Sequence, residues 1–187
     1  METWDAITSR RNVRSFTDQP IPAADLDRIL EAGRRSPSSQ NWQPWDFILV
    51  TDRDQLHELA QTWRGAGHVA GSAATIVVLA PAEDNAFRRA QLDLGQAIMA
   101  ITLAAADLGI GSCHAGVQDV DRARQLLGFP ADRNWAFLIS LGYRRTGRSA
   151  RSGNQTAVHL IRSSIEAAGK PSDRPWASRP RTDVIKL

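Results

Sequence analysis

The spacing of apolar residues predicts several helices separated by short strands. Leu26, Ile29 and Leu30 recur at helical intervals, which predicts a helix over residues 23–34. Residues 87–108 are expected to form the longest helix, and its apolar side chains cover so much of its surface that burial on several sides is expected. The other helices expected are residues 4–10, 120–127 and 156–168 and a helix that begins at Asp52.

Short apolar or extended runs between the predicted helices indicate the strands. These strands are expected at residues 47–51, 74–80, 112–117 and 135–143. Gly109 follows the longest predicted helix and is suited to end it, because glycine adopts a left-handed conformation easily. Helices that alternate with few short strands indicate an α/β or α+β fold.

The two ends of the chain carry weaker signals. Thr3 or Asp5 is the expected N-cap of the first helix, whose Trp4 and Ile7 are expected to face inward. Residues 170–187 contain three prolines and are expected to be extended or partly disordered.

The composition is typical of a single globular domain. The chain has 187 residues, of which 42% are hydrophobic and 23% charged. No apolar run approaches the roughly 20 residues of a membrane helix, and the acidic N-terminus does not resemble a signal peptide. The single cysteine, Cys113, excludes an intrachain disulfide and fits a reducing compartment. A cytoplasmic location is therefore predicted.

The net charge of +3 conceals an uneven distribution. Residues 144–187 hold ten Lys or Arg and three Asp or Glu, a net charge of +7, which leaves −4 for residues 1–143. Arginine predominates, and its guanidinium suits bidentate contact with phosphate. A nucleic-acid arm is the alternative, but the tail has one aromatic residue, Trp176, and no known nucleic-acid-binding motif. A solvated tail, or one that holds a single phosphate, is the favoured interpretation.

A basic cluster follows the first predicted helix. Residues 10–16 have the sequence Arg-Arg-Asn-Val-Arg-Ser-Phe, so three arginines and one asparagine lie within five positions. Such a cluster can surround a phosphate dianion with charge-assisted hydrogen bonds, with Val13 and Phe16 anchored in the core. On composition alone, a solvated charged turn is the more common arrangement.

A polar segment between two predicted elements is the second candidate. Residues 37–45 have the sequence Pro-Ser-Ser-Gln-Asn-Trp-Gln-Pro-Trp. Hydroxyl and amide groups on a proline-stiffened loop can recognise the edge of a heterocycle such as a flavin, and Trp42 can cover an aromatic face. The alternative is an ordinary structured loop, and for Trp45 a place in the core is expected.

Other chemistries find little support in the sequence. Residues 65–70 and 109–116 contain glycine patterns like those of dinucleotide-binding loops, but neither lies between a strand and a helix. The four histidines are scattered, which gives no metal-binding pattern. Cys113 and His114 are neighbours in a predicted strand, so their side chains are expected on opposite faces rather than as a catalytic pair.

The motifs together resemble the nitroreductase family. Residues 10–16 are similar to its R-R-S-V-R-x-F opening, and residues 37–45 to its P-S-S-x-N-x-Q-P-W loop. Residues 96–116 are similar to its long helix with the glycine-rich segment that follows, and residues 137–143 to its last core strand. The resemblance covers about residues 4–145, in order and at the family's spacing.

The resemblance implies a three-layer α+β fold with a mostly antiparallel central sheet flanked by helices, in an intertwined homodimer. Two FMN molecules are expected at the dimer interface. Arg10, Asn12 and Arg14 are assigned to the ribityl phosphate, and Arg11 to the cofactor more generally. The polar residues at positions 38, 39, 41 and 43 are expected to come from the partner subunit, and the backbone at Ala115 and Gly116 to lie near the flavin N5. The residues assigned to FMN are Arg10, Arg11, Asn12, Arg14, Ser38, Ser39, Asn41, Gln43, Ala115, Gly116, Arg148 and Arg151.

The expected domains are residues 1–169, which bind FMN, and a C-terminal extension, residues 170–187, that wraps the partner subunit. The resemblance implies an NAD(P)H-dependent FMN oxidoreductase that reduces nitroaromatic, quinone or related acceptors by a ping-pong mechanism. Alternatives are a protein that stores or senses flavin, and a family member that fragments flavin with oxygen or removes halide. Two departures from the family pattern are Asn12, in place of a serine, and His114, where an aromatic residue is common.

Overall fold

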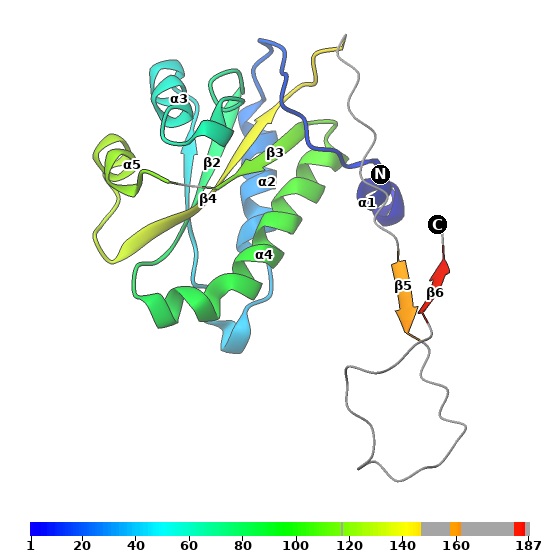
Figure 1. Cartoon of the computed structure of the whole chain (residues 1–187). Helices are drawn as coiled ribbons and strands as arrows, with labels where there is room; N and C mark the ends of the chain where they lie inside the picture. The colour runs from blue at the N-terminus through cyan, green and yellow to red at the C-terminus, as the bar shows by residue number, and fades with distance from the viewer. Residues whose placement is uncertain (117, 147–157, 162–181, 186–187) are drawn as a thin grey trace, which may run out of the picture. The chain divides into compact units, whose positions relative to one another are not determined.

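A four-stranded antiparallel sheet in the order β1–β2–β4–β3 forms the centre of the fold (Figure 1). The alternating burial expected of a one-sided sheet is missing from β2, in which every residue is buried, because helices cover both of its faces. The strands are β1 (Asp46–Val50), β2 (Ala74–Pro81), β3 (Gly111–Ala115) and β4 (Arg133–Gly142). The predicted α+β class with an antiparallel central sheet is confirmed.

This computed structural model describes residues 1–116, 118–146, 158–161 and 182–185. The chain separates into two compact units, residues 1–150 and 151–187. In the second unit, β5 (Val158–Ile161) pairs antiparallel with β6 (Thr182–Ile185). None of the helices in the described ranges is long and apolar enough to cross a membrane.

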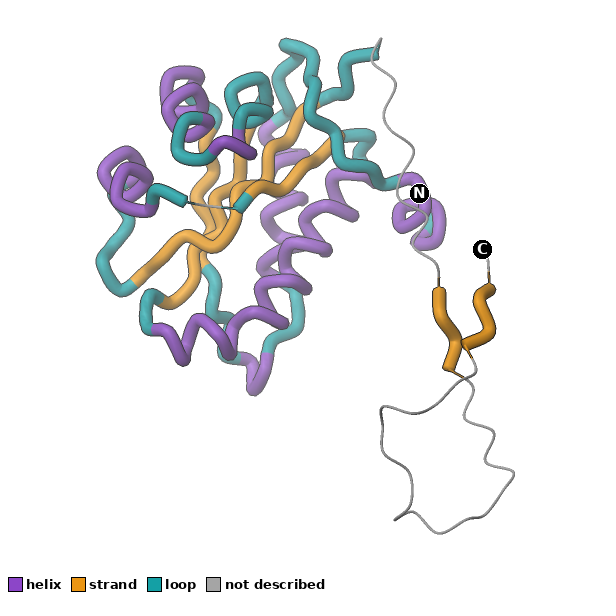
Figure 2. Tube along the Cα trace, viewed as in Figure 1, coloured by secondary structure: helices purple, strands orange, loops and turns teal. Residues whose placement is uncertain are grey.

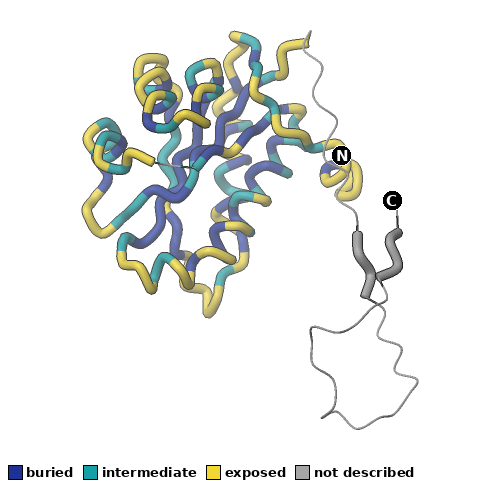
Figure 3. The backbone as a smooth tube through the Cα atoms, in the orientation of Figure 1, coloured by how far each residue is buried: buried dark blue, intermediate teal, exposed yellow. Residues whose placement is uncertain are grey.

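Helices cover both faces of the sheet and so complete three layers (Figure 2). Successive residues of β2 point to opposite faces: Ile76 packs in a core with α2 and α4, and Val77 in a second core with α3 and α5. The burial pattern in Figure 3 follows these two cores. The helices are α1 (Thr3–Ser9), α2 (Ala23–Arg34), α3 (Arg53–Ala60), α4 (Asp84–Asp107) and α5 (Val120–Leu127), with short 3-10 turns η1 (Ser39–Asn41) and η2 (Arg64–Ala66).

Local caps explain where two of these helices begin. Asp52, the predicted start of α3, accepts a hydrogen bond from the Gln55 backbone N–H at 2.9 Å. Helix α4 starts three residues earlier than predicted because Glu83 caps it and accepts from two backbone N–H groups, at 2.8 and 2.7 Å. These bonds favour the charged carboxylate and lower the pKa of Glu83. At the other end, Gly109 adopts φ +72°, as expected for the predicted stop.

Two predictions about the ends of the chain are wrong. The N-cap of α1 is Glu2 rather than Thr3 or Asp5, and no side chain caps the helix. Trp4 and Ile7 do not face inward: they are 71% and 50% exposed, because α1 packs against the fold mainly through Ala6.

The helix predicted over residues 156–168 is also wrong where the structure describes it. Residues 158–161 form β5, because pairing with β6 satisfies their backbone groups through a segment that a local periodicity does not include. The rest of that predicted helix lies outside the described residues. Within residues 170–187, the described part is the strand β6, in keeping with the expected extended chain.

Candidate functional site

The basic segment 10–16, called the basic arm below, lies along the start of β3 and past the end of β4. Asn12 forms a parallel bridge with Ser112, and the Val13 backbone N–H donates to the Ser112 carbonyl at 2.9 Å. Farther along, the Arg145 guanidinium donates to the Phe16 carbonyl at 2.8 Å. At that end Phe16 also forms an antiparallel bridge with Arg144, so backbone pairing fixes the arm at both ends.

Two glycines let the arm lie this close to the sheet. Gly111 and Gly142 are paired residues of β3 and β4. A Cβ at Gly111 would lie 2.7 Å from a methyl group of Val13, and one at Gly142 would lie 2.7 Å from the ring of Phe16. Real Cβ atoms do not approach other carbons so closely, so these two positions form the platform on which the apolar side of the arm rests.

The polar side of the arm presents positive charge without a carboxylate partner. Among the residues that the structure describes, no acidic side chain forms a salt bridge with Arg10, Arg11 or Arg14. Arg10 donates to the Asn12 side chain at 3.3 Å, while Arg11 turns back to the carbonyls of Thr8 and Arg10. Asn12 and Arg14 are exposed. A cluster of this kind fits a phosphate dianion.

A partly buried hydrogen-bond chain joins His68, Ser140 and Cys113. The His68 Nδ1 is 2.7 Å from the Ser140 hydroxyl, which itself donates to the Cys113 carbonyl at 3.1 Å. Because that hydroxyl has one proton, its oxygen accepts from Nδ1–H, which leaves the His68 Nε2 as an acceptor. Burial, and then the charges of Arg14 and His114, lower the pKa of His68 to about 4, so the ring is neutral near pH 7.

Strand β3 separates two neighbouring side chains, as predicted. Cys113 is buried and His114 is exposed, with the His114 ring at an edge-to-face angle to Phe137. Burial raises the pKa of the Cys113 thiol, and the charges of Arg14 and Arg10 oppose this only in part. Ala115 is buried at the end of the strand, and Gly116 is half-buried.

The polar segment 37–45, called the polar loop below, is held in an unusual conformation. Three of its residues that are not glycine, Gln40, Asn41 and Gln43, have φ of 53°, 57° and 51°. The Ser38 hydroxyl accepts from the Gln43 backbone N–H at 2.9 Å, and the Asn41 side chain accepts from the Gln43 amide at 2.8 Å. Trp45 is buried, which confirms its expected place in the core.

Helix α4 anchors the polar loop. The Asp93 carboxylate accepts from the Ser39 backbone N–H, at 3.2 and 3.1 Å to its two oxygens, and from the Ser39 hydroxyl at 3.3 Å. One turn earlier on the helix, the Arg89 guanidinium lies 5.3 Å from the centre of the Trp42 ring. The sequence held a signal for Asp93, because it is a charged residue at the same helical spacing as the buried Ala90 and Ala97.

The structure brings the basic arm to β3 but keeps the polar loop away from it. The arm pairs with Ser112, just past the C-terminal end of α4, whereas the loop is anchored at Asp93. At about 1.5 Å per residue, Asp93 and Asp107 lie about 21 Å apart along the helix. Figure 1 shows the loop, in light blue, and the arm, in dark blue, toward opposite ends of α4.

Two predicted arginines cannot be placed. Arg148 and Arg151 lie outside the described residues, as does Val117. Arg145, which the sequence did not single out, contacts the arm through the Phe16 carbonyl and lies 3.4 Å from the Asp18 carboxylate. His68 was not singled out either, because nothing local predicts its contact with Ser140.

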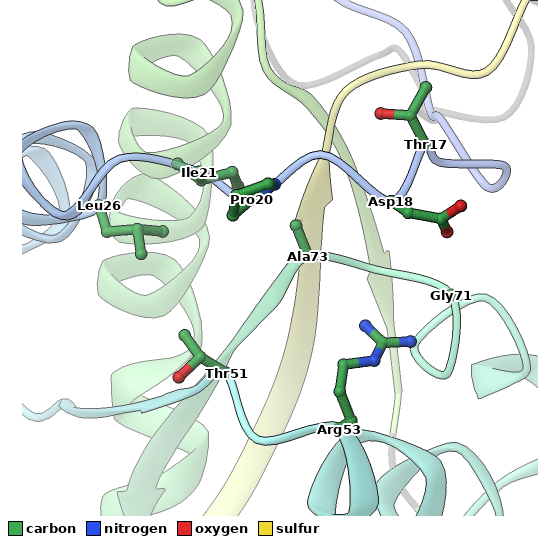
Figure 4. Close-up of a pocket in the computed structure, with 9 residues that line it drawn as sticks. All are labelled: Thr17, Asp18, Pro20, Ile21, Leu26, Thr51, Arg53, Gly71 and Ala73. Atoms are coloured by element: carbon green, nitrogen blue, oxygen red, sulfur yellow. The ribbon is translucent and has the colours of Figure 1, made fainter.

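A separate hollow of about 500 Å³ lies beside the segment that follows the arm (Figure 4). Figure 4 shows Arg53 rising toward Gly71 and Ala73, with Pro20 and Ile21 across from it. The Arg53 guanidinium is already engaged by the carbonyls of Ser72 and Ala70, and no site residue predicted from the sequence lines the hollow. Within the described ranges, no group of acidic, histidine or cysteine side chains could hold a metal ion.

Comparisons with known proteins agree with this architecture. The model of the Nitroreductase family matches residues 7–65 and 55–143. A protein of Archaeoglobus fulgidus, provisionally named NADH dehydrogenase/NAD(P)H nitroreductase, is 34% identical over 148 residues, which is 76% of this chain and 85% of that protein. The structure of an FMN-dependent nitroreductase from Clostridium difficile R20291 has a TM-score of 0.72 and 27% identity, and covers 80% of this chain and 92% of its own.

A third relative is the FMN reductase [NAD(P)H] of Bacillus subtilis. It is 30% identical over 116 residues, which is 62% of this chain and 46% of that protein. The match therefore spans about half of the Bacillus enzyme.

Proposed function

This chain belongs to the nitroreductase family, and on that basis we propose that it binds FMN and uses NAD(P)H to reduce small electron-poor acceptors. The observation that carries the proposal is the basic arm, whose arginines have no carboxylate partner in the described structure and are held against β3. FMN, when bound, supplies hydride transfer at its N5 atom.

The arm is suited to the FMN phosphate. Arg10 and Arg14 donate charge-assisted hydrogen bonds, and Asn12 supplies the neutral donor for which the family commonly uses serine. Arg11 is the peripheral member of this set, since its guanidinium already caps the end of α1. Arg148 or Arg151 is expected to complete the phosphate site from the chain that follows β4.

We assign the flavin ring to the region beside β3. The backbone at Ala115 and Gly116 would lie along the ring, where an N–H group can stabilise negative charge as the ring is reduced. His114 is exposed on the same strand and would make the space above the ring more polar. His68, whose pKa is lowered by burial and then by the charge of Arg14, is neutral and so adds no positive charge near Arg14. Its second ring nitrogen can accept a hydrogen bond.

The polar loop is proposed to serve a second copy of the chain. Because the loop lies about 21 Å along α4 from the arm, the residues of the loop and those of the arm do not contact the same small group within one chain. In a homodimer, Ser38, Ser39, Asn41 and Gln43 of one subunit would reach the flavin held by the arm of the other. The residues 170–187 are proposed to wrap the partner subunit.

An exposed apolar surface supports the dimer. On α4, Leu92 and Met99 are 70% and 48% exposed and lie on one face of the helix with Gly95. On α1, Trp4 and Ile7 are also exposed. Large apolar side chains gathered on two packed helices are typical of a protein interface. The lone buried thiol of Cys113 is compatible with a cytoplasmic enzyme.

The first test is spectroscopic. The purified protein is reconstituted with FMN, and NADH or NADPH is added without oxygen. Bleaching of the bound flavin band, followed by its recovery when a nitroaromatic or quinone is added, is the expected result. Bound flavin that never bleaches would instead favour storage or sensing, and a protein that cannot bind FMN would refute the proposal.

A pair of variants links the activity to the arm. Arg14→Ala is expected to weaken FMN binding at least tenfold, because one charge-assisted hydrogen bond to phosphate is lost. The matched control is Arg122→Ala, which removes the same side chain from α5, where it pairs with Glu58 of α3. Equal FMN affinity in the two variants would show that the arm does not hold the phosphate.

A further inference from the structure

We propose that Asp93 is a positioning residue that fixes the polar loop, and that it thereby sets the FMN affinity of the partner subunit's site rather than its own. This inference rests on the proposed function, because it assumes that the loop completes a flavin site. Asp93 would not touch the flavin. The inference also states which subunit acts on which: Asp93 of one subunit affects the FMN site formed by the arm of the other.

The contact between Asp93 and the loop is buried and specific. Asp93 is 1% exposed, although it is ionisable and lies in the middle of a helix. Its two oxygens accept the Ser39 backbone N–H and the Ser39 hydroxyl. Among the residues that the structure describes, Ser39 supplies every hydrogen bond that the carboxylate accepts. A buried carboxylate held by one residue of one loop ties the two together tightly.

The loop requires such an anchor because its backbone is strained. Gln40 and Gln43 adopt left-handed conformations that are unfavourable for glutamine, and Asn41 between them is left-handed as well. Strained conformations of this kind persist only where the surroundings hold them. The bond to Asp93 lies directly before the first strained residue, and the bond between Ser38 and Gln43 closes the turn.

A carboxylate suits this place better than the corresponding amide. Both groups that face Asp93, the backbone N–H and the hydroxyl of Ser39, donate hydrogen bonds, and a carboxylate offers acceptors on both oxygens. Asparagine keeps the shape but replaces one acceptor with an NH₂ group that opposes the N–H donor. The loop is then expected to leave its strained conformation without loss of the helix.

The first experiment compares FMN affinity in two aspartate variants. Asp93→Asn is expected to raise the dissociation constant of FMN at least tenfold, measured by quenching of flavin fluorescence. Asp84→Asn is the matched control, since Asp84 is exposed in the first turn of the same helix, and its affinity is expected to equal that of the wild type. Wild-type affinity in Asp93→Asn would overturn the inference.

The second experiment tests the direction of the effect with mixed dimers. Subunits carrying Arg10→Ala and subunits carrying Asp93→Asn are given different affinity tags, and the dimers that hold both are purified. If Asp93 acts on the partner's site, one site combines the intact arm of the Asp93→Asn subunit with the intact loop of the Arg10→Ala subunit. Such a dimer is expected to bind one FMN with near wild-type affinity.

The mixed dimer separates positioning from a general loss of stability. If Asp93 acted within its own subunit, each site would carry one defect, and no tight FMN would be bound; that result would overturn the inference. The same measurement applies if the Asp93→Asn homodimer folds poorly, because the Arg10→Ala subunit of the mixed dimer keeps Asp93 and its loop intact. Failure of the proposed function is distinguishable, because in that case the wild type itself binds no FMN.

Discussion

Substitution of Gly111 by alanine is expected to displace the basic arm and weaken cofactor binding. The new Cβ would lie 2.7, 2.8 and 3.0 Å from Cγ2, Cβ and Cγ1 of Val13. Carbon atoms in contact are normally about 3.5–4.0 Å apart, so the gap must open by about 0.7 Å or more. Rotation of the Val13 side chain cannot relieve the clash with its own Cβ, so the backbone of the arm must move.

The magnitude follows from the contacts that hold Val13. Overpacking of this kind costs about 1–3 kcal/mol, and the hydrogen bond from the Val13 N–H to the Ser112 carbonyl contributes about 1 kcal/mol more if it breaks. The reduced entropy of the unfolded chain offsets about 0.4–1 kcal/mol of this loss. We therefore expect a net loss of about 1–3 kcal/mol, or a Tm lower by about 2–12 °C.

Cofactor binding is expected to suffer through the residues on either side of Val13. Asn12 and Arg14 move with the displaced backbone, and one charge-assisted hydrogen bond is worth about 1.5–3 kcal/mol. Loss of one such bond raises the dissociation constant of FMN by about 10- to 100-fold. Titration followed by flavin fluorescence measures this, and Gly71→Ala is the control, because its Cβ would have no atom within 4 Å.

A double variant makes the reasoning refutable. Val13→Ala removes the two methyl groups that meet the new Cβ, so Gly111→Ala with Val13→Ala is expected to recover part of the lost FMN affinity, in a non-additive cycle. If Gly111→Ala binds FMN as the wild type does, the platform does not set the position of the arm. Purely additive effects of the two substitutions would also contradict the clash.

Three further outcomes are expected. The free energy of unfolding should fall as the pH drops from 6.5 toward about 4, because the lowered pKa of His68 means that the unfolded chain takes up the proton first. The loss is about 1–2 kcal/mol after allowance for partial exposure. Urea unfolding measured across that pH range should show a smaller loss in His68→Asn. Gly95→Ala should favour the helical conformation of α4 by about 0.5–1 kcal/mol, since the new Cβ would meet nothing beyond the backbone of its own helix within 4 Å. It should nevertheless weaken the dimer, as measured by sedimentation; a tighter dimer would mean that the interface lies elsewhere. Leu92→Asp should yield monomers that have lost FMN, whereas Gln125→Asp on α5 should remain dimeric.

Helices α2 and α5 could be predicted to the residue because their signals are local. Both have apolar residues at helical spacing, and α5 also has a capping aspartate before it and Gly128 after it. The faces of α1 could not be predicted in the same way, because burial of Trp4 depends on what packs against it rather than on its neighbours in sequence. The pairing of β5 with β6 is likewise invisible to local periodicity.

The candidate site shows the same contrast between local signals and contacts that are distant in sequence. On composition alone the basic arm resembles a solvated charged turn, so the phosphate role assigned to it depends on the motifs found elsewhere in the chain and stays a prediction. The hydrogen bond between His68 and Ser140 joins residues 72 positions apart, and the sequence held no signal for it. The polar loop could be predicted as polar, but its left-handed residues could not, since Gln40 and Gln43 are not types that favour that conformation.

Helix α4 shows why the two halves of the proposed site depend on each other. Successive residues on a helix point about 100° apart, and Leu92, Asp93 and Leu94 use three such directions: Leu92 is exposed, Asp93 holds the polar loop and Leu94 is buried in the core. Along the helix axis, the loop anchor Asp93 is therefore about 1.5 Å from Leu92 in the exposed surface and about 1.5 Å from Leu94 in the core. A change that rotates or shifts the helix cannot alter one of these contacts alone. In the proposed homodimer, subunit association and loop geometry are linked for this reason, since the same turn of one helix would serve both.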